Sequence, residues 1–202
     1  MTQYKTQEKQ LLLAGKPVTL RIIKDPDSLL DGELPSNKVP YWAELWPSAL
    51  ELSSYIAGLN LRGEAVLELG CGLGLTTIAI SYANGVPLAI DYDPDALRFA
   101  QHNLQANHGS GAFARMDWSA LALSCSFPYI VAADILYDRA ELPKIGKLLR
   151  HYLQRGGQIM IAEPGRGVAQ SFFQSLSLYG LYVLQKIPTA LDRVTIWKLG
   201  KL

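Results

Sequence analysis

Short apolar runs alternate with longer amphipathic segments along most of the chain, from residue 64 onward. The short runs are β-rich and end at turn residues, as buried strands do; they predict strands at 65–69, 87–91, 112–116, 128–134 and 158–163. The longer segments repeat apolar residues with the helical period; they predict helices at 75–82, 94–107, 139–152 and 168–179. This alternation predicts an α/β fold, with a mostly parallel sheet and helices on both of its faces.

The two ends of the chain depart from this alternation. The elements expected there are a strand at 18–23, a turn-rich stretch at 25–40, a helix from near Pro47 to about Gly58, and two strands at 181–187 and 193–199. The last two strands flank a turn and predict an antiparallel hairpin that closes the sheet. We interpret residues 1–60 as a cap on the substrate side of a core at 61–202, within a single domain spanning 1–202.

Composition narrows the class of protein. Hydrophobic residues make up 49% of the 202 residues, enough for a sizeable core, and the net charge of +1 gives no general attraction to nucleic acid or membranes. Cys71 and Cys125 are too few for a disulfide scaffold, and no segment has the pattern of a membrane span or secretory signal. The three histidines lack the spacing of metal ligands, so we expect no metal site. These features predict a cytoplasmic protein.

A glycine-rich turn between the first core strand and its helix carries the most chemistry. It runs Glu68-Leu69-Gly70-Cys71-Gly72-Leu73-Gly74-Leu75, and its glycines allow a tight turn and close approach of a ligand to the helix amino terminus. A dinucleotide fingerprint requires glycine where Leu75 stands, and a phosphate-binding loop requires a following Gly-Lys-Ser/Thr. The spacing instead resembles motif I of the class I, seven-strand S-adenosylmethionine (SAM) methyltransferases. A turn that only packs strand against helix is the structural alternative.

Acidic residues follow the next two strands. Asp91 lies 21 positions after Gly70, where a carboxylate that accepts from ribose hydroxyls is expected; Asp93 is a second candidate, or a helix cap. Asp117 and Trp118 follow the third strand, where a base would lie between a hydrogen-bond acceptor and an aromatic ring, unless they are a turn Asp and a core Trp. Ligands of open α/β sheets lie beyond the carboxyl ends of the strands.

Two further segments narrow the resemblance. Asp134-Ile135-Leu136-Tyr137 ends the fourth strand, and Trp-Ala-Glu-Leu-Trp-Pro-Ser-Ala at 42–49 precedes motif I. Together they resemble the seven-strand protein lysine methyltransferases, in the branch that includes the electron-transfer flavoprotein β-subunit lysine methyltransferase. The resemblance covers roughly residues 39–165, and Glu163-Pro164-Gly165-Arg166 also fits it. It implies a Rossmann-like, seven-strand methyltransferase sheet.

The resemblance also implies roles for individual residues. It assigns Glu68, Gly70, Cys71, Gly72, Gly74 and Leu75 to the methionine part of SAM, Asp91 to ribose, Asp117 and Trp118 to adenine, Trp46 and Ala133 to the cofactor wall, and Asp134 and Tyr137 to the substrate amine site. Trp42 could add an aromatic wall that tolerates a cation. The alternative is that Asp134 caps a helix beginning near Asp138 and Tyr137 belongs to the core.

The resemblance therefore predicts a SAM-dependent transferase that methylates lysine side chains of a protein. Two alternatives stay open: the same chemistry on a small-molecule amine, and a non-catalytic SAM-binding module. An NAD(P)-dependent oxidoreductase is disfavoured by Leu75. A nucleic-acid substrate is disfavoured because Asp134-Ile135-Leu136-Tyr137 lacks the prolines of an Asn/Asp-Pro-Pro-Tyr/Phe motif. We expect neither nucleic-acid nor membrane partners.

Overall fold

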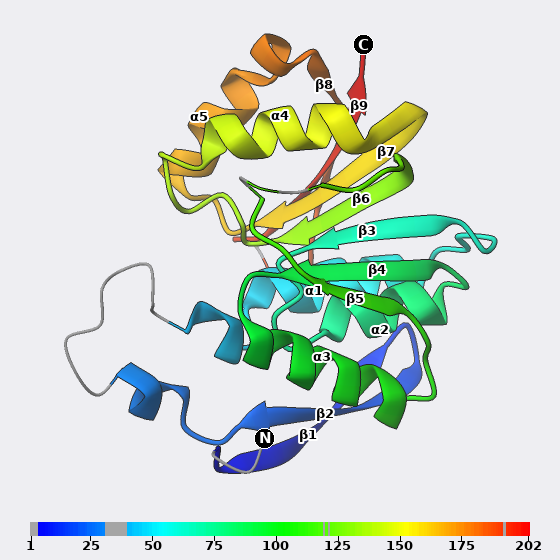
Figure 1. Ribbon diagram of the computed structural model, residues 1–202, viewed down its shortest axis with the longest axis vertical. Helices are drawn as coiled ribbons and strands as arrows, with labels where there is room; N and C mark the ends of the chain where they lie inside the picture. Colours follow the sequence, from blue (N-terminus) through cyan, green and yellow to red (C-terminus); the bar gives the residue numbers. More distant parts are fainter. Residues whose placement is uncertain (1–3, 31–39, 119, 121, 192) are drawn as a thin grey trace.

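A seven-stranded sheet organises the computed structural model, which describes residues 4–30, 40–118, 120, 122–191 and 193–202 (Figure 1). Five strands run parallel, in the spatial order β5 (Ala112–Arg115), β4 (Val86–Asp91), β3 (Ala65–Leu69), β6 (Phe127–Ala133) and β7 (Leu153–Glu163). Strand β9 (Thr195–Lys201) pairs antiparallel with β7, and β8 (Leu181–Pro188) pairs antiparallel with β9. The predicted fold class is confirmed.

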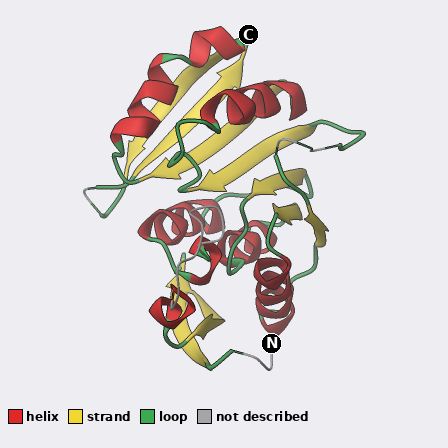
Figure 2. Cartoon of the chain, turned by 60° about the vertical axis from the view of Figure 1, so that its left-hand side comes forward, coloured by secondary structure: helices red, strands yellow, loops and turns green. Residues whose placement is uncertain are grey.

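Helices cover both faces of this sheet (Figures 1 and 2). One face carries α1 (Pro47–Ala57), α2 (Leu75–Tyr82) and α3 (Pro94–Ala106); the other carries α4 (Leu142–Tyr152), α5 (Gly167–Gln174) and the 3₁₀ turn η4 (Leu176–Tyr179). Side chains of a strand point alternately to opposite faces. In β3, Val66 accordingly joins the core beneath α1–α3, whereas Leu67 and Leu69 join the core beneath α4 and α5.

The predicted elements differ from the observed ones mainly around β7. This strand begins directly after α4, so Arg155-Gly156-Gly157 lies inside the strand and does not stop the helix. The pairing of β6 with β7 shifts register here, and Gly156 has φ +79°, which is typical of a bulge. Likewise, the helix expected at 168–179 is divided at Ser175, whose hydroxyl donates to the carbonyls of Ser171 and Phe172.

The amino-terminal region forms a separate hairpin of β1 (Thr6–Leu13) and β2 (Lys16–Ile23). The strand predicted at 18–23 lies within β2, but β1 was not predicted, because its first residues are polar and exposed and show no apolar alternation. The hairpin packs on α3. A 3₁₀ turn, η1 (Pro26–Leu30), follows, and residues 31–39 of the predicted turn-rich stretch lie outside the described residues.

Of the first 60 residues, the segment that includes the 3₁₀ turn η3 (Tyr41–Ala43) and the start of α1 approaches the carboxyl ends of the parallel strands. The division into a cap and a core, like the single-domain assignment, stays a prediction. Across the described residues, every helix is too short or too polar to cross a membrane.

Candidate active site

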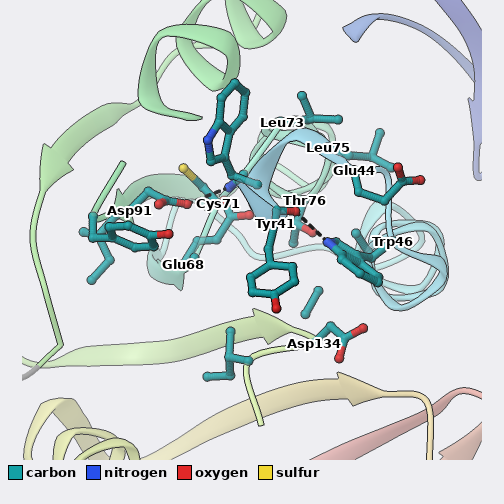
Figure 3. Close-up of a pocket in the computed structure, with 18 of the residues that line it drawn as sticks. Tyr41, Glu44, Trp46, Glu68, Cys71, Leu73, Leu75, Thr76, Asp91 and Asp134 are labelled. Atoms are coloured by element: carbon teal, nitrogen blue, oxygen red, sulfur yellow. Dashed lines mark hydrogen bonds between the residues drawn. The ribbon is translucent and has the colours of Figure 1, made fainter. Parts of the chain in front are cut away.

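A cavity opens at the carboxyl ends of the parallel strands, where β3 pairs with β4 on one side and with β6 on the other. Such a reversal of strand order is where open α/β sheets bind ligands. The cavity encloses about 950 Å³, its open mouth included, and Figure 3 shows its lining. The lining comes from residues 41–49, the glycine-rich turn, the ends of β4 and β5, and the segment 133–137 after β6.

The glycine-rich turn forms the floor of this cavity. Gly70 and Gly72 have φ of +68° and +49°, values that favour glycine. The amides of Gly70 and Cys71 donate to the Ile90 carbonyl at 2.9 and 3.1 Å, which fixes the turn against β4. A Cβ at position 72 would lie 3.3 Å from the Trp42 carbonyl oxygen, so the space beside the turn depends on glycine.

The assignment of Gly74 to the methionine part of SAM stays a prediction, and the structure gives this glycine a packing role. It does not line the cavity; it precedes α2 with φ +81°, and a Cβ there would lie 2.6 Å from Cα of Ala100 in α3. This glycine therefore permits close contact between α2 and α3.

Asp91 ends β4 and is held by the turn that it faces. Its Oδ2 accepts from the Gly72 amide and its Oδ1 from the Asp93 amide, both at 3.0 Å. Burial raises the pKa of the Asp91 carboxyl, although these backbone hydrogen bonds oppose the change. Asp93 caps α3, with its Oδ1 accepting from the Asp95 amide at 2.7 Å, so the assignment of Asp93 as a helix cap is confirmed.

Glu68 is a second buried carboxyl in the lining. Burial raises its pKa to about 8, and the Thr77 hydroxyl donates to its Oε2 at 2.5 Å. The adjacent Cys71 thiol is also buried, and its pKa is raised well above the usual range, first by burial and then by the Glu68 and Asp91 charges. A thiol in these surroundings is a poor nucleophile.

The opposite wall follows β5. Met116, Asp117 and Trp118 line the cavity here, and the Met116 amide donates to the Asp91 carbonyl at 3.0 Å, which holds this segment against the end of β4. Trp118 is partly buried and packs on the core beneath α4 and α5. A Cβ at position 70 would lie 3.9 Å from Cζ3 of the Trp118 indole. The wall thus combines a carboxylate with apolar surface.

The segment after β6 forms the far end of the cavity. Asp134 has φ +55°, its amide donates to the Ala162 carbonyl at 2.9 Å, and its side chain is only 5% exposed. Arg166 donates to both carboxylate oxygens, from Nε to Oδ1 at 2.9 Å and from Nη2 to Oδ2 at 3.0 Å. The helix-cap alternative for Asp134 is wrong, because α4 starts at Leu142 with Glu141 as its cap residue.

Arg166 is the important residue that sequence reasoning passed over. It lies in the turn after β7, where Glu163 Oε2 accepts from the amides of Gly165 and Arg166 at 2.8 and 3.1 Å. The hydrogen bond to Asp134 raises the pKa of Arg166 further, so the guanidinium stays charged. The only available signal was the sequence Glu163-Pro164-Gly165-Arg166 after a core strand.

Aromatic side chains surround this far end. Trp46 Nε1 donates to the Tyr41 carbonyl at 2.8 Å, and the Tyr41 ring centroid lies 5.5 Å from that of Tyr137 (Figure 3 shows Tyr41 and Trp46). Tyr137 is 42% exposed, so it is not a core residue, and burial of its hydroxyl end raises its pKa to about 12. Trp42 contributes to the lining, but its ring packs against Tyr4 and Phe99. Tyr41, which was not predicted, supplies the aromatic wall expected of Trp42.

The charge of the lining is one-sided. Among the described lining residues, five are acidic (Glu44, Glu68, Asp91, Asp117 and Asp134) and none is lysine, arginine or histidine. Burial keeps the Glu68 carboxyl largely protonated near pH 7 and Arg166 pairs with Asp134, but the remaining carboxylates favour cationic ligands over phosphate groups. Apolar residues such as Leu73, Leu75, Ile90 and Ile135 supply the remaining surface.

Comparison with known proteins agrees with this geometry. A family model described as lysine methyltransferase matches residues 39–178, well over half of the chain. The mouse electron transfer flavoprotein beta subunit lysine methyltransferase is 33% identical over 132 residues, which cover 63% of this chain and 51% of that protein. Mouse EEF1A lysine methyltransferase 3 is 32% identical over 143 residues, covering 66% of this chain and 61% of that protein.

The chain thus spans about half to three fifths of the length of these relatives. Among solved structures, magnesium protoporphyrin IX methyltransferase from Synechocystis, crystallised with SAH, superposes with a TM-score of 0.64 at 16% identity, covering 88% of this chain and 93% of that one. That similarity concerns the fold alone. The match of the family model over residues 39–178 identifies the chain as a member of the lysine methyltransferase family.

Proposed function

We propose that this chain is a SAM-dependent N-methyltransferase acting on lysine side chains of a protein. The observation that carries the proposal is an acidic, partly apolar cavity at the strand-order reversal, ending in Asp134 and Tyr137 beside an aromatic wall. Family membership supports it, as do two relatives that are named as protein lysine methyltransferases. The cytoplasmic location stays a prediction from the sequence.

The residues present fit SAM, which carries a positive sulfonium, an amino group and ribose hydroxyls. Each Asp91 oxygen accepts one backbone hydrogen bond and has a further lone pair for a ribose hydroxyl. Asp117 and Trp118 would hold the adenine, and Glu68 with the glycine-rich turn would hold the methionine part. The cofactor wall would include Trp46, Cys71, Leu75 and Ala133. Five carboxyls without a basic residue in the described lining favour such a ligand over a dinucleotide.

The acceptor end must take lysine as an uncharged nucleophile. From a reference pKa of about 10.4, deprotonation near pH 7.4 costs roughly 4 kcal/mol. The aromatic surfaces of Tyr41 and Tyr137 would remove water from the amine and so lower its pKa. The released proton would leave through the open mouth of the cavity.

Two oxygen atoms would then orient the amine. A neutral primary amine has two N–H donors and one lone pair; if Asp134 and Tyr137 accept the two hydrogens, the lone pair is directed at the cofactor side of the cavity. SAM, when bound, supplies a methyl carbon whose bond to sulfur breaks as the amine lone pair forms the new N–C bond.

Labelling tests this proposal. A cell lysate would be incubated with the protein and SAM labelled in its methyl group, and the labelled residue would be mapped by mass spectrometry. We expect label on a protein lysine. Label confined to small molecules would support the small-amine alternative, and SAM binding without any transfer would support the non-catalytic one; either result would overturn the proposal.

Matched variants test the acceptor residues. Asp134→Ala should lower methyl transfer at least ~100-fold while calorimetry shows SAM binding retained. Asp138→Ala is the control, because Asp138 is an exposed carboxylate four residues away that does not line the cavity. Full activity of Asp134→Ala would show that the acceptor site lies elsewhere.

A further inference from the structure

Asp134 is already engaged on both oxygens before any substrate arrives. The two hydrogen bonds from Arg166, at 2.9 and 3.0 Å, form a bidentate ion pair. Each carboxylate oxygen has two lone pairs, so each can still accept one further hydrogen bond. At the end of the cavity where the lysine would bind, Asp134 therefore offers free lone pairs for hydrogen bonds. Its negative charge is balanced by Arg166, whereas the sequence alone suggests an isolated carboxylate.

Arg166 is held in this position from several directions. Glu163 fixes the backbone of its turn, Gly165 in that turn has φ +83°, and the guanidinium carbon lies 6.0 Å from the centre of the Trp46 ring. Arg166 is 39% exposed, whereas Asp134 is 5% exposed, so the cation reaches in from the rim of the cavity toward a buried anion. A side chain held in this way has a defined place relative to Asp134.

This pairing affects which form of lysine the cavity accepts. An isolated carboxylate beside the acceptor nitrogen would stabilise the ammonium form, which has no lone pair and does not react. A carboxylate that Arg166 neutralises loses most of that preference, yet still accepts a hydrogen bond from an amine N–H. The ion pair can therefore orient the amine by accepting a hydrogen bond from it, without stabilising the positively charged ammonium form.

We propose that Arg166 is a positioning residue that neutralises Asp134, so that the acceptor end takes lysine as the neutral amine and not as the ammonium ion. This inference rests on the proposed function. The groups that face Arg166 are Asp134 after β6, Glu163 at the end of β7 and Tyr41 in η3. Tyr137, Glu44, Glu68, Asp91 and Asp117 also line the cavity, and they are unchanged in the variants used below.

Binding of n-butylamine, a probe for the lysine side chain, tests the inference without a methyl acceptor protein. The amine would be titrated by NMR into protein saturated with S-adenosylhomocysteine, between pH 7 and pH 9.5. In this range almost all of the free amine is protonated, and the neutral fraction rises tenfold per pH unit. The wild-type affinity should therefore rise close to tenfold per unit, whereas Arg166→Gln should bind the ammonium ion with an affinity that hardly changes with pH.

Two further variants separate charge from structure. Arg166→Lys keeps a positive charge and should keep the wild-type slope. The double variant Asp134→Asn with Arg166→Gln has no charge at this point and should also keep that slope. Burial raises the pKa of Glu68 to about 8, and this residue is the same in all of the variants, so the comparison between variants isolates the pair of Asp134 and Arg166.

Three results would overturn the inference. If Arg166→Gln shows the same tenfold rise per unit with lower affinity throughout, Arg166 has only a structural role. If the wild-type affinity is independent of pH, the cavity binds ammonium despite the pair, while the proposed function stands. If the wild-type protein binds S-adenosylhomocysteine but no amine, the acceptor assignment itself is wrong. Calorimetry with S-adenosylhomocysteine identifies a misfolded variant, and Arg166→Met then replaces Arg166→Gln.

Discussion

At the scale of one residue, Gly74 shows that the glycines of one turn meet two different requirements: space beside the cavity and close packing of two helices. Gly70 and Gly72 lie at the cavity, but at position 74 the demand comes from the contact of α2 with Ala100. The spacing that distinguishes this turn from a dinucleotide fingerprint therefore depends partly on helix packing. A sequence motif records both demands without separating them.

Substitution of Gly74 measures the packing demand. Gly74→Ala would adopt φ +81°, at about 1–2 kcal/mol, and would place Cβ 2.6 Å from Cα of Ala100, an overlap that typically adds about 1–3 kcal/mol. Gly63→Ala is the matched control, since Gly63 has the same φ of +81° with nothing within 4 Å of a Cβ. Urea unfolding should show the larger loss for Gly74→Ala; equal losses would mean that packing contributes nothing.

Glu68 should make stability depend on pH. Its pKa is about 8 in the folded chain against an ordinary value of 4.5, so between these values the folded state binds more protons than the unfolded state. The free energy of unfolding should therefore fall as pH rises through this window, by about 1.4 kcal/mol per unit of pKa difference and a few kcal/mol in all.

Glu68→Gln removes this titration. In urea unfolding, the free energy of unfolding of the variant relative to that of the wild type should be roughly 2–4 kcal/mol higher at pH 9 than at pH 5.5. Glu64→Gln, at an exposed position of the same region, is the control and should show no such gain. A Glu68→Gln difference that is constant with pH would show that this carboxyl does not titrate in the window.

At the scale of secondary-structure elements, strong apolar periodicity located the parallel core well. Strand β3 and helix α2 have the predicted bounds, because each is mainly apolar and lies between turns that contain glycine. Elements that depend on tertiary contacts were not found. Strand β1 has an exposed, polar beginning, and the bulge in β7 resembles a helix stop because glycine serves both purposes.

The attachment of the amino-terminal hairpin also escapes sequence patterns. Asn103 in α3 and Asn107, the residue that ends this helix, replace the hydrogen bonds of a neighbouring strand. Asn107 pairs with the backbone of Thr19 and Asn103 with that of Arg21, each side-chain amide both accepting and donating. Asn103 donates as well to the Leu73 carbonyl at 2.9 Å, which links the hairpin to the glycine-rich turn. The helical period places both asparagines on the buried face of α3, but it does not indicate that they pair with the backbone of β2.

Asn103→Ala should therefore destabilise the protein strongly, because the Asn103 side chain is buried. It removes three hydrogen bonds of a buried amide, each worth about 1 kcal/mol, so we expect a loss of roughly 2–4 kcal/mol in urea unfolding. Gln105→Ala, on the exposed side of the same helix, should change stability by less than about 0.5 kcal/mol. Comparable effects of the two variants would show that the hairpin is not anchored through Asn103.

At the scale of the whole molecule, the cavity was predictable in outline because parallel strands bring their carboxyl ends together. This convergence gathers Glu68, Asp91, Asp117 and Asp134 from separate segments. The partner of Asp134 was not predictable in the same way, since Arg166 reaches it across 32 positions of sequence through a turn that Glu163 fixes. Whether a carboxylate in the site is paired with a cation depends on how the fold places the two side chains, and the spacing of residues in a motif does not show this.

The distribution of charge over the molecule should decide which cofactor stabilises it. The chain carries a net charge of only +1, yet the described lining of its cavity has five carboxyls and no basic residue. A ligand bound across segments from Tyr41 to Tyr137 holds distant parts of the fold together. SAM at 100 times its dissociation constant should raise the free energy of unfolding by about 2.7 kcal/mol.

NADH at the same concentration should leave the unfolding temperature unchanged, because its two phosphates would face carboxylates, and Arg166 is already paired with Asp134. Differential scanning calorimetry in 50 mM and 500 mM NaCl measures both effects. The shift with SAM should shrink at the higher salt, as expected for attraction between a cationic ligand and an acidic cavity. An equal shift with NADH, or a SAM shift that salt leaves unaltered, would mean that shape and not charge selects the ligand.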